Sequence, residues 1–120
     1  MILVDTNAWV THVRSSDPRL VRLLEQSRVV TCDVVIGELL LGAGLPKALT
    51  SLLALVPRLP CATAAETLLF VGRYDRVFRS SGVGWADAQI IVAGAEAGAL
   101  VYSSDRAVRK VWRRLGFRLP

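Results

Sequence analysis

The segment MILVDTNAWV at residues 1–10 sets the fold, because it runs an apolar stretch directly into a carboxylate. Ile2, Leu3 and Val4 form a short apolar run of the kind found in buried strands. The residues that follow, 7–14, indicate one or two helical turns. An aspartate at such a junction either caps the helix or belongs to an active site. This stretch alone leaves both interpretations of Asp5 open.

The same alternation of strand and helix recurs along the rest of the chain. Asp17 and Pro18 mark a helix start, Thr63 and Glu66 form a capping box, and Gly98 ends a helix. Helices are expected at 18–27, 34–44, 46–56, 63–80, 85–97 and 106–115, and strands at 28–31, 55–60, 99–103 and 117–120. This pattern predicts the α/β class, in a three-layer α/β/α fold with a central parallel sheet and helices on both faces.

Length and composition predict one globular domain that spans residues 1–120. Mean hydropathy is high, at +0.43, but the longest stretch without a charged residue is 48–57, which is too short to cross a bilayer. Met1 leads directly into the first strand without a basic segment, so no signal peptide is expected. Cys32 and Cys61 have no CxxC spacing and are expected to be reduced. A cytoplasmic protein without membrane contact is therefore predicted.

Six of the ten acidic residues have a sufficient structural explanation. They are expected to cap helices, to pair with arginines at helical spacing or to face solvent: Asp17, Glu25, Asp33, Glu66, Asp75 and Glu96. Asp33 in particular is expected to cap the helix that ends at Gly44. Four acids remain, and each follows an apolar strand or lies on an apolar helix face: Asp5, Glu38, Asp87 and Asp105.

These four carboxylates can converge at the carboxyl end of the sheet, where sites in such folds collect. Individually, Asp5 and Asp105 are explained as helix caps, and Glu38 and Asp87 as partners in buried ion pairs. Together they would repel one another, and each pKa would rise unless a cation neutralised them. Oxygen ligands without a cysteine or histidine cluster select Mg²⁺ or Mn²⁺.

Four features together resemble one known family. They are VDTNAWV at 4–10, IGELLLG at 36–42, ADAQIIVAGAEAGALVYSSD at 86–105, and the total length. The chain resembles the PIN-domain ribonucleases, in particular the VapC toxins of bacterial type II toxin–antitoxin pairs. The resemblance implies a PIN-like fold and endonucleolytic cleavage of RNA that depends on Mg²⁺ or Mn²⁺. It places the catalytic and metal-binding acids at Asp5, Glu38, Asp87 and Asp105, and supporting side chains at Thr6, Asn7 and Ser103.

One position departs from the family pattern. The family usually has an aromatic residue shortly after its last acid, whereas Asp105 is followed by RAVRK. This departure leaves the share of Asp105 in metal binding open. Thr6 and Asn7 are expected to cap the following helix while Asp5 points toward the metal.

A basic helix face and two protein partners complete the prediction. The final helix has basic residues on one face, and they are expected to bind the RNA backbone: Arg106, Arg109, Lys110, Arg113 and Arg114. Arg73, Arg76 and Arg79 add to this rim. The resemblance further implies a homodimer and a cognate antitoxin, which is expected to bind the helices around 7–25 and 36–56. The substrate would be structured tRNA or rRNA, and its cleavage would inhibit translation and growth.

Three alternatives compete with this prediction. A non-catalytic receiver-like signalling module has a similar length and element order. It would need an acidic pair after the first strand and a lysine after a late strand, and the chain has neither. A PIN-domain module without metal would lack one of the four acids, and none is missing. A PIN-domain nuclease that processes RNA without a toxin role fits the sequence equally well.

Overall fold

The computed structural model describes residues 1–42 and 45–120, and its centre is a parallel sheet of three strands. The strands are β1 (Ile2–Val4), β2 (Val29–Val30) and β3 (Leu100–Tyr102). Their order is β2-β1-β3, so the first strand of the chain lies in the middle. Ile2 pairs with Val29 on one side and with Leu100 on the other. All strands therefore end at the same edge of the sheet, as the alternating pattern predicts.

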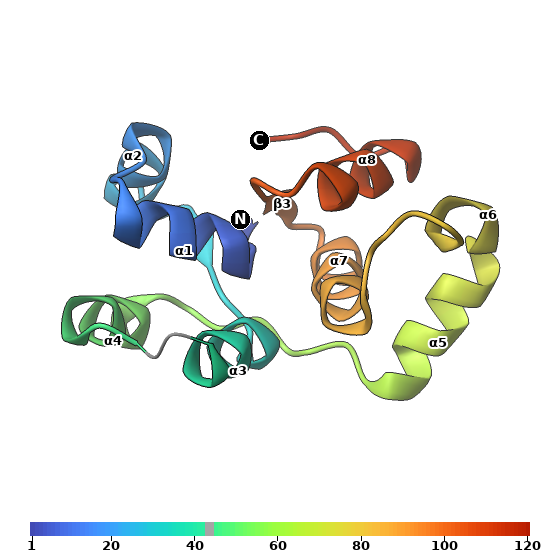
Figure 1. The fold of residues 1–120 in the computed structure, drawn as a ribbon, viewed down its shortest axis with the longest axis horizontal. Helices are drawn as coiled ribbons and strands as arrows, with labels where there is room; N and C mark the ends of the chain where they lie inside the picture. Colours follow the sequence, from blue (N-terminus) through green and yellow to red (C-terminus); the bar gives the residue numbers. More distant parts are fainter. Residues whose placement is uncertain (43–44) are drawn as a thin grey trace.

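Helices connect the strands and cover the sheet (Figure 1). Those before the middle of the chain are α1 (Thr6–Arg14), α2 (Pro18–Glu25), α3 (Asp33–Leu41) and α4 (Lys47–Leu55). The second half contributes α5 (Ala64–Arg73), α6 (Asp75–Phe78), α7 (Trp85–Ala97) and α8 (Arg106–Arg114). In Figure 1, α1 and α2 lie on one side of the strands, and α7 and α8 lie on the other. The predicted α/β class with helices on both faces is confirmed.

Most helix boundaries follow from local capping chemistry. The Asp17 side chain accepts a hydrogen bond from the Arg19 backbone N–H at 2.9 Å. Thr63 and Glu66 form both bonds of the predicted capping box, and Gly98 ends α7 in the left-handed conformation with φ 69°. The caps at Asp17 and Thr63 and the stop at Gly98 are confirmed.

Several sequence-based expectations were wrong in detail. Asp33 does not cap α3, because Cys32 holds the cap position and Asp33 lies in the first turn, 3.1 Å from Arg58. The predicted end of this helix at Gly44 lies outside the described residues. The helix predicted over 63–80 is interrupted at Tyr74, whose ring packs against Phe70 at 4.8 Å between centroids.

Two predicted strands are reduced or missing in the part of the chain that the structure describes. The strand expected at 55–60 is a single parallel bridge between Thr31 and Arg58. The strand expected at 117–120 is irregular, because Phe117 stacks on Trp112 at 4.3 Å between ring centroids. The Trp112 indole N–H also donates to the Arg118 carbonyl oxygen at 2.8 Å. Packing on α8 therefore replaces pairing with the sheet.

Helix α7 packs directly on β3, and Gly94 makes this approach possible. A Cβ atom at position 94 would lie 2.7 Å from Val101 Cγ2. Val101 and Trp112 are buried in one cluster with Ile91, so the β3 face toward α7 and α8 is apolar. This contact fixes where α7 begins relative to the carboxyl ends of the strands. No helix within the described residues is long and apolar enough to span a membrane.

Candidate metal-binding active site

Asp5 lies at the carboxyl end of the central strand and begins α1 as its N-cap residue. Its side chain is 1% exposed. One carboxylate oxygen accepts a hydrogen bond from the Thr6 backbone N–H at 2.7 Å, and the other accepts one from the Ser103 hydroxyl at 2.7 Å. Asp5 itself occupies the cap position that was expected for Thr6 and Asn7. The cap and active-site interpretations therefore apply to the same side chain.

Glu38 lies on α3 and is connected to Asp5 by hydrogen bonds to Thr6. The Thr6 hydroxyl donates to one Glu38 carboxylate oxygen at 2.6 Å. Because Thr6 is the first residue of α1, this bond ties α3 to the start of α1 across 32 positions of sequence. Thr6 was predicted as a supporting residue, but no sequence pattern indicated this partner.

Asp87 lies in the first turn of α7 and completes a group of three acids. One carboxylate oxygen from each of Asp5, Glu38 and Asp87 lies within 4.8 Å of the other two, which is a spacing that could hold a metal ion. Within residues 1–42 and 45–120, none of the three forms an ion pair with a basic side chain. Three elements thus bring three uncompensated carboxylates together.

The electrostatics of this group favour a cation. Burial and, to a smaller extent, the charges of Asp87 and Glu38 raise the pKa of Asp5 from 3.8 to about 6, against the lowering effect of the hydrogen bonds from Ser103 and Thr6. Burial also raises the pKa of Asp87, with added repulsion from Glu38 and Asp105. Bringing a divalent cation to these oxygens would offset both effects, and an all-oxygen donor set suits Mg²⁺ or Mn²⁺.

Asp105 has a different environment from the other three acids. One of its oxygens caps α8, accepting from the Ala107 and Val108 backbone N–H groups at 2.8 and 3.1 Å. The other accepts a weak, long hydrogen bond from the Asn7 side chain at 3.4 Å. Asp105 is therefore close enough to raise the pKa of Asp87, but it is not a member of the group of three.

Ser103 connects the acids that follow β1 and β3. Its hydroxyl donates to Asp5 and accepts from the Asp105 backbone N–H at 3.0 Å. This pair of bonds fixes the orientation of the hydroxyl and holds the two strand ends at one spacing. Thr6 and Ser103 each contact two of the four acids that the sequence singled out, and Asn7 contacts one.

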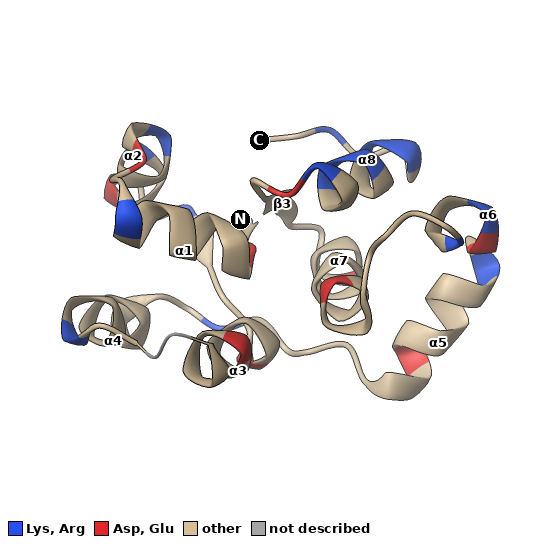
Figure 2. Cartoon of the chain, viewed as in Figure 1, with Lys and Arg blue, Asp and Glu red and all other residues tan. Residues whose placement is uncertain are grey.

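Basic residues gather along α8, next to the acids (Figure 2). Figure 2 shows lysine and arginine along α8, and acidic residues at the start of α1, on α3, at the start of α7 and just before α8. A hollow of about 310 Å³ on α8 is lined by Arg106, Arg109, Lys110 and Arg113. Of the additional predicted rim residues, Arg79 already pairs with Asp75 at 3.1 Å.

A second cavity at the same edge of the sheet includes Arg19, which sequence reasoning did not single out. Arg19 lies on α2, far along the chain from β3 and α8, so no spacing rule connects it to the site. Its one sequence signal is its position directly after the Asp17-Pro18 helix start.

Comparison with known proteins agrees with this geometry. Residues 2–113 match the family model of the PIN domain. The chain is 35% identical over 121 residues to ribonuclease VapC32 of two Mycobacterium tuberculosis strains, covering 99% of this chain and 96% of the relative. The crystal structure of M. tuberculosis VapC20, a sarcin–ricin loop cleaving toxin, matches with a TM-score of 0.65 at 21% identity. That match covers 98% of this chain and 97% of the other, and shows the shared fold. The chain therefore belongs to the PIN-domain family, and within it to the VapC-type ribonucleases.

Proposed function

We propose that the protein is a Mg²⁺- or Mn²⁺-dependent endoribonuclease in which Asp5, Glu38 and Asp87 hold the metal. The observation that carries this proposal is the group of three carboxylate oxygens within 4.8 Å, without a compensating basic partner among the described residues. Charge repulsion in this group is relieved only by protons or by a cation. At neutral pH, a divalent cation is the better match for three hard oxygen ligands.

A bound divalent cation supplies Lewis-acid stabilisation of the negative charge that develops on the phosphate during cleavage. The side chains of this protein hold the geometry for that chemistry. The Ser103 hydroxyl and the Thr6 backbone N–H fix the Asp5 carboxylate, and the Thr6 hydroxyl fixes Glu38. Either Glu38 or Asp105 orients the attacking water. In both cases the second oxygen of the carboxylate is the group that accepts a hydrogen bond from that water.

The direct test uses purified protein, freed of any partner, on total RNA with Mg²⁺, with Mn²⁺ and with EDTA. We expect cleavage with either metal and none with EDTA, and we expect Asp87→Asn to abolish it. The matched control is Asp33→Asn, which removes an exposed acid that only pairs with Arg58. Cleavage that persists in EDTA or in Asp87→Asn would contradict the proposed metal dependence.

Metal binding can be measured separately from cleavage. Glu38→Gln is expected to lower the affinity for Mn²⁺ in calorimetry, because it removes one of three carboxylate ligands. The exposed acid Glu25, changed to glutamine, serves as the control. Unchanged Mn²⁺ binding by Glu38→Gln would return Glu38 to a structural role.

We also propose that the protein is the cytoplasmic toxin of a type II toxin–antitoxin pair, a single domain over residues 1–120 that forms a homodimer and inhibits translation and growth. The 35% identity to VapC32 supports the toxin role. The fold shared with VapC20, which cleaves the sarcin–ricin loop, supports a structured RNA substrate, that is tRNA or rRNA. Three exposed leucines on α3 and α4 support a protein partner there: Leu40, Leu41 and Leu55.

The toxin role is tested in cells. Expression of the chain is expected to arrest growth, and co-expression of the product of a neighbouring gene is expected to relieve the arrest. Normal growth under expression of an active nuclease would favour a PIN-domain enzyme that processes RNA without a toxin role. Light scattering of the purified chain gives its oligomeric state.

A further inference from the structure

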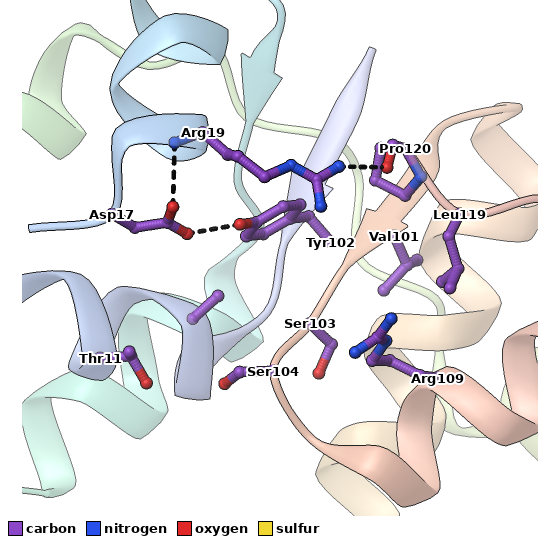
Figure 3. Close-up of a pocket in the computed structure, with 11 residues that line it drawn as sticks. Thr11, Asp17, Arg19, Val101, Tyr102, Ser103, Ser104, Arg109, Leu119 and Pro120 are labelled. Carbon is purple, nitrogen blue, oxygen red and sulfur yellow. Dashed lines mark hydrogen bonds between the residues drawn. The ribbon is translucent and has the colours of Figure 1, made fainter.

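A cavity of about 180 Å³ lies beside the acidic site, between α1, α2 and the start of α8 (Figure 3). Its walls include three hydroxyl side chains and two guanidinium groups: Thr11, Ser103, Ser104, Arg19 and Arg109. Drug-sized ligands fill pockets of roughly 300 Å³ or more. At about 30 Å³ per water molecule, this cavity has room for a smaller group, such as the phosphate and sugar of one nucleotide.

The Arg19 guanidinium is held in place at the cavity wall. It donates to the Pro120 carbonyl oxygen at 2.7 Å and lies over the Tyr102 ring, 5.7 Å from its centroid. A guanidinium has five N–H donors, and the side-chain contact with Pro120 uses one of them. The side chain is thus oriented in advance and keeps donors for a ligand.

Asp17 also lines the cavity, but among the described residues it forms no ion pair with either guanidinium. Both oxygens of Asp17 are occupied, one by the Arg19 backbone N–H and the other by the Tyr102 hydroxyl. Arg109 has neither an ion pair nor a side-chain hydrogen bond with the described residues. Two guanidinium groups and the hydroxyls of Thr11 and Ser104 are a donor set for a phosphate, since the single Ser103 O–H already donates to Asp5.

The cavity and the acidic site share one residue. Ser103 lines the cavity, and its hydroxyl donates to the Asp5 carboxylate at 2.7 Å. Arg109 in turn lines both this cavity and the basic hollow on α8. An RNA backbone that binds the basic hollow on α8 therefore reaches the cavity at Arg109.

We propose that this cavity binds the phosphate and sugar of the nucleotide next to the cleaved bond, with Arg19 and Arg109 on the phosphate. This inference rests on the proposed ribonuclease function and deepens it, because it assigns a nucleotide subsite to α1 and α2. Ser104 and Thr11 face the same ligand and supply hydroxyl groups to its sugar or phosphate oxygens.

The test is binding of a fluorescein-labelled single-stranded RNA to Asp87→Asn protein in EDTA, measured by fluorescence anisotropy at several salt concentrations. Arg19→Gln and Arg109→Gln are each expected to weaken binding about tenfold. Each is also expected to reduce the slope of log affinity against log salt by about one. Arg28→Gln, at the amino end of β2, removes the same charge at the opposite edge of the sheet. Its expected effect is less than about twofold.

A second pair of variants leaves both arginines in place. Thr11→Glu puts a negative charge into the cavity wall and is expected to weaken RNA binding at least as much as Arg19→Gln. Thr50→Glu makes the same exchange at an exposed position of α4, outside the cavity, and is expected to leave binding unchanged. Thermal melting of each variant reports whether it is folded.

Three results would overturn the subsite. One is equal weakening by Arg19→Gln and Arg28→Gln, which is the result of charge alone. Another is unchanged RNA binding by folded Thr11→Glu, and this result would count against the subsite even if the variant no longer bound a protein partner. The proposed function is judged on different data, namely metal-dependent cleavage by the wild-type protein. Cleavage that is lost in EDTA while Arg19→Gln binds RNA normally would keep the nuclease and reject the subsite.

Discussion

The β1–α1 and β3–α8 junctions have the same sequence pattern and different chemistry. In each, an apolar strand is followed by an aspartate that caps the next helix, Asp5 for α1 and Asp105 for α8. Asp5 is 1% exposed, and burial raises its pKa to about 6. Asp105 is half-buried, and one of its oxygens is taken by two backbone N–H groups of α8.

The order of the strands explains the difference. Because β1 lies between β2 and β3, the residue that follows it is enclosed by neighbours on both sides. Strand β3 is at the edge of the sheet, so the residue position after it is more open to solvent. The comparison shows that a strand-end aspartate becomes a strong metal-ligand candidate when its strand is central.

The largest expected effect is on the rate of RNA cleavage, which should depend on Asp5 much more than on Asp105. Asp5→Asn is expected to lower the rate of RNA cleavage by about 10³-fold, because it removes a charged ligand from the buried group. Single-turnover rates with Mg²⁺ measure this loss. The same variant is expected to melt no lower than the wild type in EDTA at about pH 7.5, since it removes a buried charge. Activity within about tenfold of the wild type would contradict the central role of Asp5.

Ser103, which contacts both junctions, should affect mainly the first. Ser103→Ala is expected to lower the cleavage rate by about 10- to 100-fold, because outer contacts orient metal ligands. Ser103→Thr retains a hydroxyl and is expected to restore most of the rate. Equal losses in both variants would show that side-chain size at this position, rather than the bond to Asp5, controls activity.

The first junction should also make the stability of the protein depend on pH. Because the folded-state pKa of Asp5 lies near 6 and its ordinary value is 3.8, the folded protein binds this proton more tightly than the unfolded chain. The resulting stabilisation is fully present below about pH 4 and is lost as pH rises through about 6. Between about pH 5 and 7.5 in EDTA, the free energy of unfolding is expected to fall by about 1.4 kcal/mol. Urea titrations of the wild type and Asp5→Asn isolate this contribution as their difference, and an identical pH dependence in both would contradict it.

The smallest effects are expected at the second junction. Asp105→Asn retains the helix cap, because asparagine caps as well as aspartate, and should change stability little. Asp105→Ala is expected to lower the free energy of unfolding by about 1 kcal/mol. Both variants are expected to keep cleavage within about tenfold of the wild type, a result that would assign the attacking water to Glu38 rather than to Asp105. A loss as large as that of Asp5→Asn would place Asp105 among the essential ligands.

Local chemistry explains what the sequence predicted well. The Asp17-Pro18 start, the Thr63 capping box and the Gly98 stop depend on neighbours within a few residues, and all three were confirmed. Eliminating acids with ordinary roles, together with the common edge of parallel strands, predicted a group of four acids, of which Asp5, Glu38 and Asp87 lie together and Asp105 does not join them.

Long-range packing explains what the sequence did not predict. The Thr6–Glu38 bond joins residues 32 positions apart, and the cavity wall at Arg19 depends on how α2 meets β3. The loss of a strand at 117–120 depends on Phe117 stacking on Trp112. The different burial of Asp5 and Asp105 depends on strand order, which the apolar runs alone do not specify.

The central position of β1 also sets when the protein becomes active during its synthesis. The first strand leaves the ribosome early, but its partner on one side is residues 100–102, near the end of the chain. Ser103, which orients Asp5, follows that partner directly. A nascent chain therefore carries all three carboxylates before it can hold Asp5 in place. The site therefore forms only after β3 has been synthesised and has paired with β1.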